Sequence, residues 1–171
     1  MTALGLIPAR YNSSRFPGKP LKIILGKSMI HRVYEQAKQS KLDRIIVATD
    51  DQRIVDEVRS FGGEVMMTSN EHISGTDRCL EALQSLGEKY DAVVNIQGDE
   101  PFIEPQQINQ LVDAFTNQNI EIVTLAKCIE NEEILANSSK PKVNFDANGL
   151  AVSFDRLINS PFQKGIFFKH I

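Results

Sequence analysis

The sequence predicts an α/β fold in which a mostly parallel open sheet carries helices on both faces. Short apolar runs alternate with amphipathic helical segments, turn residues separate them, and the first run, residues 3–9, is apolar throughout. A strand that is apolar on both faces is typical of a parallel sheet covered by helices on each side. We expect one domain spanning residues 1–171.

The first strand is expected at residues 3–9. Ser28 is a good N-cap for a helix over 29–39, in which apolar residues recur at helical spacing. The β-branched run 44–49 predicts a second strand, and Asp50 is placed to cap the helix that follows it. An acid after a second strand can also bind ribose in dinucleotide sites, but no glycine fingerprint accompanies it here.

The same alternation continues toward the C-terminus. The further elements expected are a strand at 64–68, a helix at about 77–87, a strand at 92–97, a helix at 106–118 and a strand at 120–127. The pattern then changes, and Asn148-Gly149 between the runs 143–146 and 150–154 predicts a β-hairpin region at the C-terminal end.

Composition and cysteine usage indicate an ordinary globular protein. Of the 171 residues, 42% are hydrophobic and 24% charged, which is enough apolar material to form a core without disulfides. Cys79 and Cys128 are isolated, so both are interpreted as small core residues in a reducing compartment. The apolar run after Met1 is too short for a signal peptide, and no run is long enough to span a membrane. We expect a cytoplasmic protein without membrane insertion.

The net charge of −3 conceals an uneven distribution. Residues 1–34 carry six basic side chains and no acid, so they are at +6, while the other 13 basic and 22 acidic residues leave the rest at −9. This asymmetry predicts an anionic partner for the N-terminal end. Nucleic acid is disfavoured because the remainder is acidic and has no basic helix, so a small phosphorylated ligand fits better.

The loop after the first strand supplies cations for such a ligand. Arg10, Arg15 and Lys19 follow the strand within ten positions of one another. Guanidinium groups can bind phosphate oxygens in pairs, and the lysine ammonium is a mobile point charge. Ser13 and Gly18 leave room for backbone amides to approach the same anion. A solvated basic surface loop is the alternative.

Two acids follow the strand at 92–97, in the stretch Gly98-Asp99-Glu100. Since ligands of open α/β sheets collect beyond the carboxyl ends of the strands, these acids are expected to face the basic loop. Asp99 is the preferred Mg²⁺ ligand, shared with phosphate oxygens, and Glu100 is expected to support it. A turn with solvated acids is the alternative.

A third polar segment, residues 72–78, precedes a helix. Its polar groups either cap the helix or let Arg78 and the backbone amides touch a nucleobase, and the residues alone leave both open. His31 lies on a helix and is expected to be structural.

Taken together, the stretches IPARYNSSRFPGKPL, HISGTDR and IQGDEP, with IIVATDD, TLA and FKHI, closely resemble the 3-deoxy-manno-octulosonate (Kdo) cytidylyltransferases. The resemblance implies a nucleotide-diphospho-sugar transferase-like fold and an Mg²⁺-dependent reaction in which CTP and Kdo give CMP-Kdo and pyrophosphate for lipopolysaccharide biosynthesis. It also implies a homodimer in the full-length form. A cytidylyltransferase for sialic acids and a non-catalytic nucleotide-binding fragment are the alternatives.

The resemblance also implies roles for individual residues. Arg10, Arg15 and Lys19 would neutralise the triphosphate and departing pyrophosphate, and Asp99 would hold Mg²⁺. The residues expected to line the cytidine and sugar pockets are Ser13, Ser74, Gly75, Thr76, Arg78, Gln97, Arg156 and His170.

Members of that family continue past the point that matches Ile171, and a later aspartate supplies their second metal carboxylate. A hard cation bound by phosphates usually takes one or two protein oxygens in fixed places. We therefore expect the domain to be incomplete at the C-terminus and the 171-residue chain to be inactive, or nearly so, by itself.

Overall fold

The computed structural model describes residues 1–12, 16–117, 119–129, 137–156 and, for the backbone alone, 168–170. The chain divides into two compact units, residues 1–121 and 122–171. The expectation of a single domain stays a prediction, and the units are described separately below.

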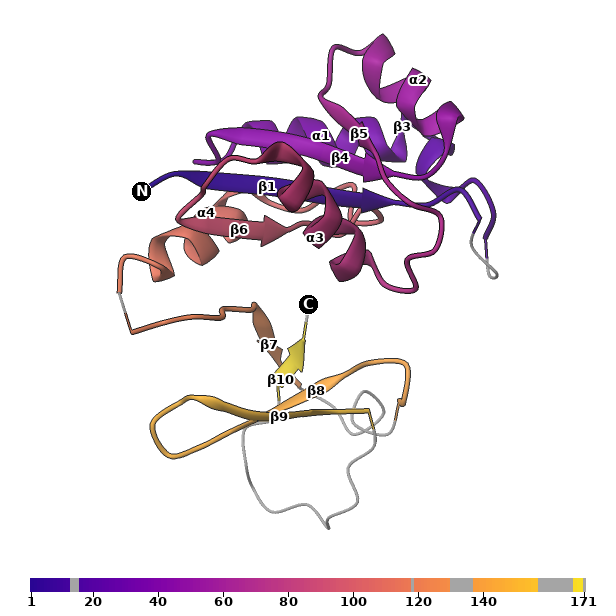
Figure 1. Cartoon of the computed structure of the whole chain (residues 1–171). Helices are drawn as coiled ribbons and strands as arrows, with labels where there is room; N and C mark the ends of the chain where they lie inside the picture. Colours follow the sequence, from indigo (N-terminus) through magenta and orange to yellow (C-terminus); the bar gives the residue numbers. More distant parts are fainter. Residues whose placement is uncertain (13–15, 118, 130–136, 157–167, 171) are drawn as a thin grey trace. The chain divides into compact units, whose positions relative to one another are not determined.

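The first unit is built on a four-stranded parallel sheet with the order β5-β4-β1-β6 (Figure 1). Its strands are β1 (Ala3–Ala9), β4 (Arg44–Thr49), β5 (Val65–Met67) and β6 (Ala92–Asn95). The strand β1 is central and buried along almost its whole length, as its unbroken apolar sequence predicts.

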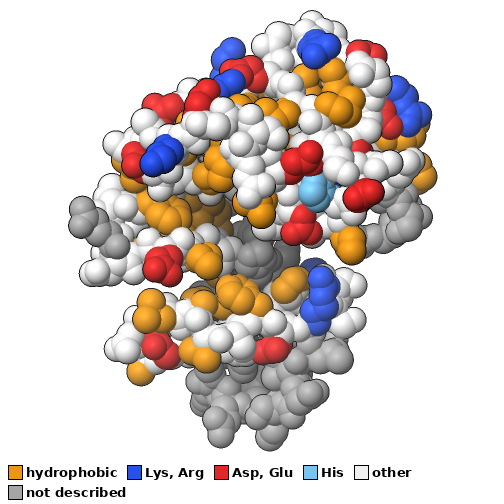
Figure 2. Space-filling view, viewed as in Figure 1, with side chains coloured by type: hydrophobic (Ala, Val, Ile, Leu, Met, Phe, Trp, Pro, Cys, Tyr) orange, Lys and Arg blue, Asp and Glu red, His pale blue; other side chains and the backbone are white. Residues whose placement is uncertain are grey.

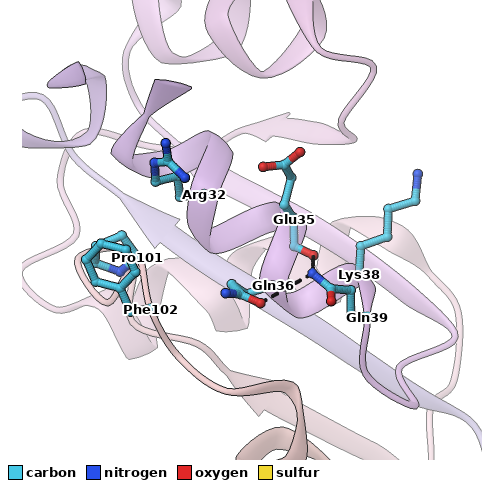
Figure 3. Close-up of a pocket in the computed structure, with 7 residues that line it drawn as sticks. All are labelled: Arg32, Glu35, Gln36, Lys38, Gln39, Pro101 and Phe102. Carbon is cyan, nitrogen blue, oxygen red and sulfur yellow. Dashed lines mark hydrogen bonds between the residues drawn. The ribbon is translucent and has the colours of Figure 1, made fainter. Parts of the chain in front are cut away.

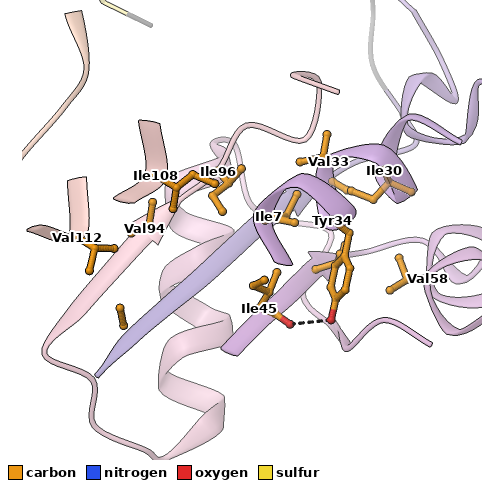
Figure 4. Packing of buried hydrophobic residues seen from close by; sticks show 14 of the residues in the cluster. Ile7, Ile30, Val33, Tyr34, Ile45, Val58, Val94, Ile96, Ile108 and Val112 are labelled. Carbon is orange, nitrogen blue, oxygen red and sulfur yellow. Dashed lines mark hydrogen bonds between the residues drawn. The ribbon is translucent and has the colours of Figure 1, made fainter. Parts of the chain in front are cut away.

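Helices cover both faces of this sheet, which confirms the predicted fold class. The helices are α1 (Met29–Lys38), α2 (Gln52–Ser60), α3 (Gly75–Leu86) and α4 (Pro105–Ala114). Side chains of α1, α2 and α4 pack with Ile7, Val47 and Ile96 in the larger apolar cluster (Figure 4). On the other face, Leu6 and its neighbours pack with Cys79 and other residues of α3. Alternate strand residues therefore serve two separate cores.

Helix starts follow the local capping rules, with one correction. The Ser28 hydroxyl accepts a hydrogen bond from the His31 amide, as predicted for the start of α1. Asp50 was predicted to cap α2, but Asp51 does so, because its carboxylate accepts from the Arg53 amide at 3.0 Å. Asp50 instead accepts a hydrogen bond from buried Arg78, so the first of the two adjacent acids is used in a tertiary contact.

A short 3-10 helix, η1 (Lys19–Leu21), and a two-stranded ribbon of β2 (Ile23–Ile24) and β3 (Lys27–Ser28) lead into α1. His31 stacks on Phe61 with ring centroids 4.1 Å apart, which agrees with its expected structural role.

The second unit contains an antiparallel sheet with the order β7-β10-β8-β9. These strands are β7 (Ala126–Cys128), β8 (Lys142–Phe145), β9 (Ala151–Asp155) and β10 (Phe168–His170). The predicted hairpin is present as β8 and β9, and Gly149 lies in its turn at a φ of 81°.

The predicted strand at 120–127 is wrong in extent and partner. Only Ala126–Cys128 is a strand, and it pairs antiparallel with β10 rather than extending the parallel sheet. The preceding Ile122 is 89% exposed, so this apolar run is not drawn into a core. The helix expected over 106–118 likewise ends at Ala114. Local β propensity does not determine which strand will be the partner.

On the face of the molecule drawn in Figure 2, acidic and basic side chains are interspersed with hydrophobic ones. Among the described residues, no helix combines the length and apolar character needed to cross a membrane.

The two cysteines differ in their surroundings. Cys79 is buried as predicted, but Cys128 is exposed, because β7 does not enter the parallel sheet in which a buried position was expected. Burial raises the pKa of the Cys79 thiol to about 12, so its thiolate is scarce at neutral pH.

We predict that Ellman's reagent at about pH 8 reacts promptly with Cys128 and reaches Cys79 only after unfolding, because only the thiolate is nucleophilic. The absorbance of the thiolate that the reagent releases, read before and after denaturation, counts the thiol of Cys128 and then that of Cys79. A Cys128→Ser variant is expected to lose the prompt phase alone. Prompt release from that variant would contradict the burial of Cys79.

Candidate functional site

Three polar loops leave the same edge of the parallel sheet, after β1, β5 and β6. Because the strands are parallel, their carboxyl ends all meet at this edge. The loops begin near Arg10, Thr68 and Ile96, and the groups predicted from the sequence lie mostly on them.

Two glycines let the second and third loops approach β1 closely. A Cβ added to Gly98 would lie 2.8 Å from the Pro8 carbonyl oxygen, and one added to Gly75 would lie 3.1 Å from the Pro8 ring. Any larger residue at position 98 would press against backbone rather than a flexible side chain. Glycine is therefore the residue that allows the loops to converge on the end of β1.

The basic and acidic loops are in direct contact. Lys19 Nζ lies 2.6 Å from Asp99 Oδ2, and the two side chains are 35% and 51% exposed. An exposed ion pair of this kind contributes little to stability, so the contact matters for its location more than for its free energy. It brings a mobile cation and a carboxylate, 80 positions apart in sequence, to one accessible point.

The turn that presents Lys19 is fixed by its backbone. Gly18 adopts a φ of 69°, and its amide donates to the Tyr11 carbonyl at 2.8 Å. The Tyr11 ring lies beside Gly18, and the guanidinium carbon of Arg53 is 3.2 Å from the centroid of that ring. Gly18 is therefore required by both its backbone conformation and the ring beside it.

Arg10 reaches from the end of β1 to the loop after β5. Its guanidinium donates to the Ile73 carbonyl at 3.0 Å and to the His72 carbonyl. A guanidinium has five N–H donors in one plane, so these two bonds leave about three donors for an anion. The carbonyl contacts fix the orientation of that plane.

The segment before α3 serves mainly as a helix cap. Ser74 Oγ accepts from the Asp77 amide at 3.1 Å and donates to the Asp77 carboxylate at 2.6 Å. Thr76 is exposed and its hydroxyl lies 3.5 Å from the Asn95 side-chain nitrogen. Of the two interpretations left open by the sequence, capping is confirmed for Ser74, while Thr76 still faces solvent.

Arg78 does not share the exposed surface with the other predicted residues. Its side chain is fully buried, and it donates to Thr68 Oγ1 at 2.5 Å, to Asp50 Oδ2 at 2.7 Å and to the Ser69 carbonyl at 3.2 Å. These three groups accept from the two terminal guanidinium nitrogens, whereas the buried Nε makes no hydrogen bond in the part of the chain that the structure describes. The contact of Arg78 with substrate stays a prediction, and the contacts of its side chain in the structure are structural.

The other residues predicted for the site do not all lie at the sheet edge of the first unit. Gln97 is exposed at the end of β6. Arg156 lies in the second unit, where it donates to the Ser138 carbonyl at 3.3 Å. Ser13, Arg15 and the side chain of His170 lie outside the described residues.

Comparison with known proteins shows which family of enzymes the chain resembles. A family model described as Cytidylyltransferase matches residues 4–165. The 3-deoxy-manno-octulosonate cytidylyltransferase of Parabacteroides distasonis is 50% identical over all of this chain and 73% of its own length. The enzyme of that name from Fusobacterium nucleatum is 47% identical, over the whole chain and 71% of its own length. The chain belongs to this cytidylyltransferase family.

A solved structure supports the family assignment at the level of the fold. CMP:2-keto-3-deoxy-manno-octonic acid synthetase complexed with CTP superposes with a TM-score of 0.92 at 40% identity, covering all of this chain and 72% of that one. A cytidylyltransferase from Leptospira borgpetersenii is 26% identical with a TM-score of 0.63, covering 77% of this chain and 56% of that one. The resemblance inferred from the motifs is thereby confirmed.

The donor set fits the divalent cation that this family resemblance implied. Asp99 is accessible at the sheet edge, and Glu100 follows it with its amide bonded to the Gln97 carbonyl. No group of three or more His, Cys, Asp or Glu side chains able to hold a metal occurs in the part of the chain that the structure describes. One or two carboxylates beside substrate phosphates is the usual protein contribution to an Mg²⁺ site.

A cavity of about 370 Å³ lies elsewhere, between α1 and the stretch Pro101-Phe102 (Figure 3). Arg32, Glu35 and Gln36 are among its lining side chains, and none of the predicted site residues lines it. The candidate site is therefore the open sheet edge rather than this cavity.

Sequence reasoning missed the groups that support the site. Glu81 contacts His72 and accepts from the Ser69 amide at 2.9 Å, which secures the loop that receives Arg10. The spacing of His72 and Glu81 carries no recognisable signal, because one lies in a loop and the other on α3. The stacking of Arg53 on Tyr11 also joins segments distant in sequence.

We predict that Gly98→Ala destabilises the protein by about 1–3 kcal/mol, because the new methyl group would press on the Pro8 carbonyl and displace the loop. Urea unfolding measures the change in the free energy of unfolding. Gln97→Ala, at the neighbouring exposed position, is expected to stay within about 0.5 kcal/mol of the wild type. Equal stability of Gly98→Ala and the wild type would refute the close approach.

Proposed function

We propose that the chain carries the catalytic groups for CMP transfer from CTP to Kdo, with CMP-Kdo and pyrophosphate as products, in lipopolysaccharide biosynthesis. The contact between Lys19 and Asp99 at 2.6 Å carries this proposal. It joins a cation, the kind of group that binds phosphate, to a carboxylate, the kind of group that binds Mg²⁺, at the edge where α/β sheets bind ligands. The proposal is supported by the names of the relatives and by the CTP complex of the similar structure.

The reaction requires an in-line displacement at the α-phosphorus of CTP. The anomeric hydroxyl oxygen of Kdo forms the new P–O bond, the bond from the α-phosphorus to the bridging oxygen breaks, and the hydroxyl proton passes to solvent. Phosphoryl and nucleotidyl transfer depend on positioning and charge neutralisation more than on covalent chemistry by the protein.

The cations of the first loop supply that neutralisation. Arg10 offers its free N–H donors in a plane fixed by two carbonyls, so it can bind phosphate oxygens without first being ordered. Lys19 sits on a flexible stem and can follow the charge onto the departing pyrophosphate. Arg15 is assigned to the same task on the strength of its position in the loop.

Mg²⁺ is the proposed cofactor, with Asp99 as its ligand and Glu100 as support. When bound, the cation would polarise the phosphate oxygens and offset their charge. Lys19 occupies one oxygen of Asp99 in the structure, so the carboxylate is already oriented toward the phosphate-binding loop.

Substrate recognition is proposed to involve Thr76 and Gln97, which are exposed near the sheet edge. The other residues assigned to the nucleotide and the sugar are Ser13, Ser74, Gly75, Arg156 and His170. Arg78 is assigned a positioning role instead, since its guanidinium is buried.

We also propose a homodimer in the full-length form and a cytoplasmic location, where CTP is available. A non-catalytic nucleotide-binding fragment is the second candidate.

A coupled pyrophosphate assay with CTP and Kdo separates these candidates. We predict release by a chain extended to the length of its relatives and little or none by the 171-residue chain. A sialic acid serves as the control acceptor. Release with a sialic acid but not with Kdo would overturn the assignment of the sugar, and no release with either acceptor would favour the binding fragment.

We predict that Asp99→Asn in the extended chain lowers turnover by about 100-fold or more and removes its dependence on Mg²⁺, because the amide oxygen carries no full charge. Initial rates against Mg²⁺ concentration measure both effects. Asp91→Asn, an exposed acid at the opposite edge before β6, is the matched control and is expected to turn over normally. Unchanged Mg²⁺ dependence in Asp99→Asn would refute the assigned role.

A further inference from the structure

The orientation of Arg10 depends on a loop that lies outside its own strand. Both of its described hydrogen bonds go to backbone carbonyls, those of His72 and Ile73. The chain around these carbonyls, residues 69–74, is not part of a helix or strand. A loop without such support gains no fixed geometry from the sheet, so other contacts must hold the carbonyls in place.

Those contacts come from α3. Glu81 Oε2 lies against His72 Nε2 and also accepts from the Ser69 amide at 2.9 Å. One carboxylate on a rigid helix therefore contacts the loop at two residues, Ser69 and His72, which are three positions apart. The Glu81 side chain is 34% exposed and that of His72 is 22% exposed, so the contact between them is partly desolvated.

Arg78, one turn earlier on α3, fixes the start of the same loop. It donates to the Ser69 carbonyl at 3.2 Å and to Thr68 Oγ1 at 2.5 Å, and Asp50 balances its charge at 2.7 Å. Ser69 is thus held through its amide by Glu81 and through its carbonyl by Arg78. The far end of the loop is secured by the Ser74 cap.

We propose that Glu81 and His72 are positioning residues that hold Arg10 in the orientation needed to receive the nucleotide triphosphate. The Glu81 carboxylate bonds to the His72 ring, and the His72 carbonyl accepts a hydrogen bond from Arg10. Arg10 is thereby oriented with its remaining N–H donors at the sheet edge. The nucleotide part of this statement rests on the proposed function, whereas the support of Arg10 by Glu81 does not.

The charge of Glu81 suits this task. Its hydrogen bond with His72 is the main cause that holds the pKa of the Glu81 carboxyl below its usual range, and Arg78 acts in the same direction. The carboxylate therefore stays ionised across the neutral range, where it accepts hydrogen bonds most strongly.

An NMR measurement tests the support of Arg10 without any nucleotide. In the ¹⁵N-labelled chain, the Arg10 Nη–H signal, which comes from the groups that donate to the two carbonyls, is assigned from its loss in Arg10→Ala. We expect Glu81→Ala to shift this signal and to speed its exchange with water about tenfold, because the accepting carbonyls are no longer held. Glu81→Gln keeps an acceptor oxygen and is expected to restore most of the wild-type behaviour.

A double-mutant cycle with CTP tests the link to the ligand. Glu81→Ala is expected to weaken CTP binding about tenfold by calorimetry in the presence of Mg²⁺, and His72→Ala similarly. In the Arg10→Ala background, Glu81→Ala is expected to cause no further loss, because the residue that it positions is absent. A residue with a purely structural role would give additive losses.

Glu88→Ala is the matched control. Like Glu81, Glu88 is a partly exposed glutamate with a basic partner, here Arg44 at 3.0 Å, but it lies at the amino end of the sheet. Its removal is expected to change neither the Arg10 signal nor CTP binding. Thermal unfolding of every variant is recorded, and His72→Leu and Glu81→Leu, which keep most of the side-chain volume but cannot form the hydrogen bond, replace any alanine variant that fails to fold.

The outcomes separate the two proposals. An unchanged Arg10 signal in Glu81→Ala overturns the positioning role, and so do additive losses of CTP affinity in the cycle. A wild-type chain that binds no CTP would count against the proposed function, and the Arg10 signal would still decide whether Glu81 and His72 position that side chain.

Discussion

Close packing against Pro8 determines the geometry on which the site depends. Gly98 approaches its carbonyl oxygen and Gly75 approaches its ring, so the loops that follow β5 and β6 both meet the end of the central strand. With any side chain larger than hydrogen at position 98, backbone would have to move. The contact between Lys19 and Asp99 joins the loop after β6, which Gly98 brings close to Pro8, to the loop that follows β1.

The N-terminal excess of positive charge is divided between two tasks. Lys27 pairs with Glu35 at 2.5 Å, Arg32 donates to two carbonyls of residues 24–25, and Lys22 lies over an aromatic ring. These cations stabilise the ribbon and α1. Arg10 and Lys19, by contrast, point their charges toward the sheet edge. The anion-binding part of the +6 charge is therefore smaller than the sequence total suggests.

Local signals in the sequence predicted the fold well, and non-local contacts account for the misses. Ser28 caps α1 as predicted because a cap needs only the residues that follow it. The choice between Asp50 and Asp51 depended on Arg78, which lies 28 positions away from Asp50. The run 120–127 has strand propensity, but its pairing depended on β10, which comes more than 40 residues later.

In the candidate site, the rule that parallel strands end at one edge was enough to predict that the acids after β6 would face the basic loop after β1, which is where Lys19 and Asp99 are in contact. The burial of Arg78 could not be predicted from the sequence, because the residue stands in a motif of exposed polar residues but is itself buried. The support by Glu81 and His72 was also hidden, because it joins a helix to a loop through side-chain spacing that follows no local period.

The pairing of Lys19 with Asp99 has a thermodynamic consequence for ligand binding. Each group neutralises the other at 2.6 Å, so a cation that takes Asp99 releases Lys19, and an anion that takes Lys19 releases Asp99. Under the proposed function, each ligand therefore raises the affinity for the other by the same factor, since binding free energies are reciprocal. The ion pair would act as a heterotropic link that favours the metal–nucleotide complex over either component alone.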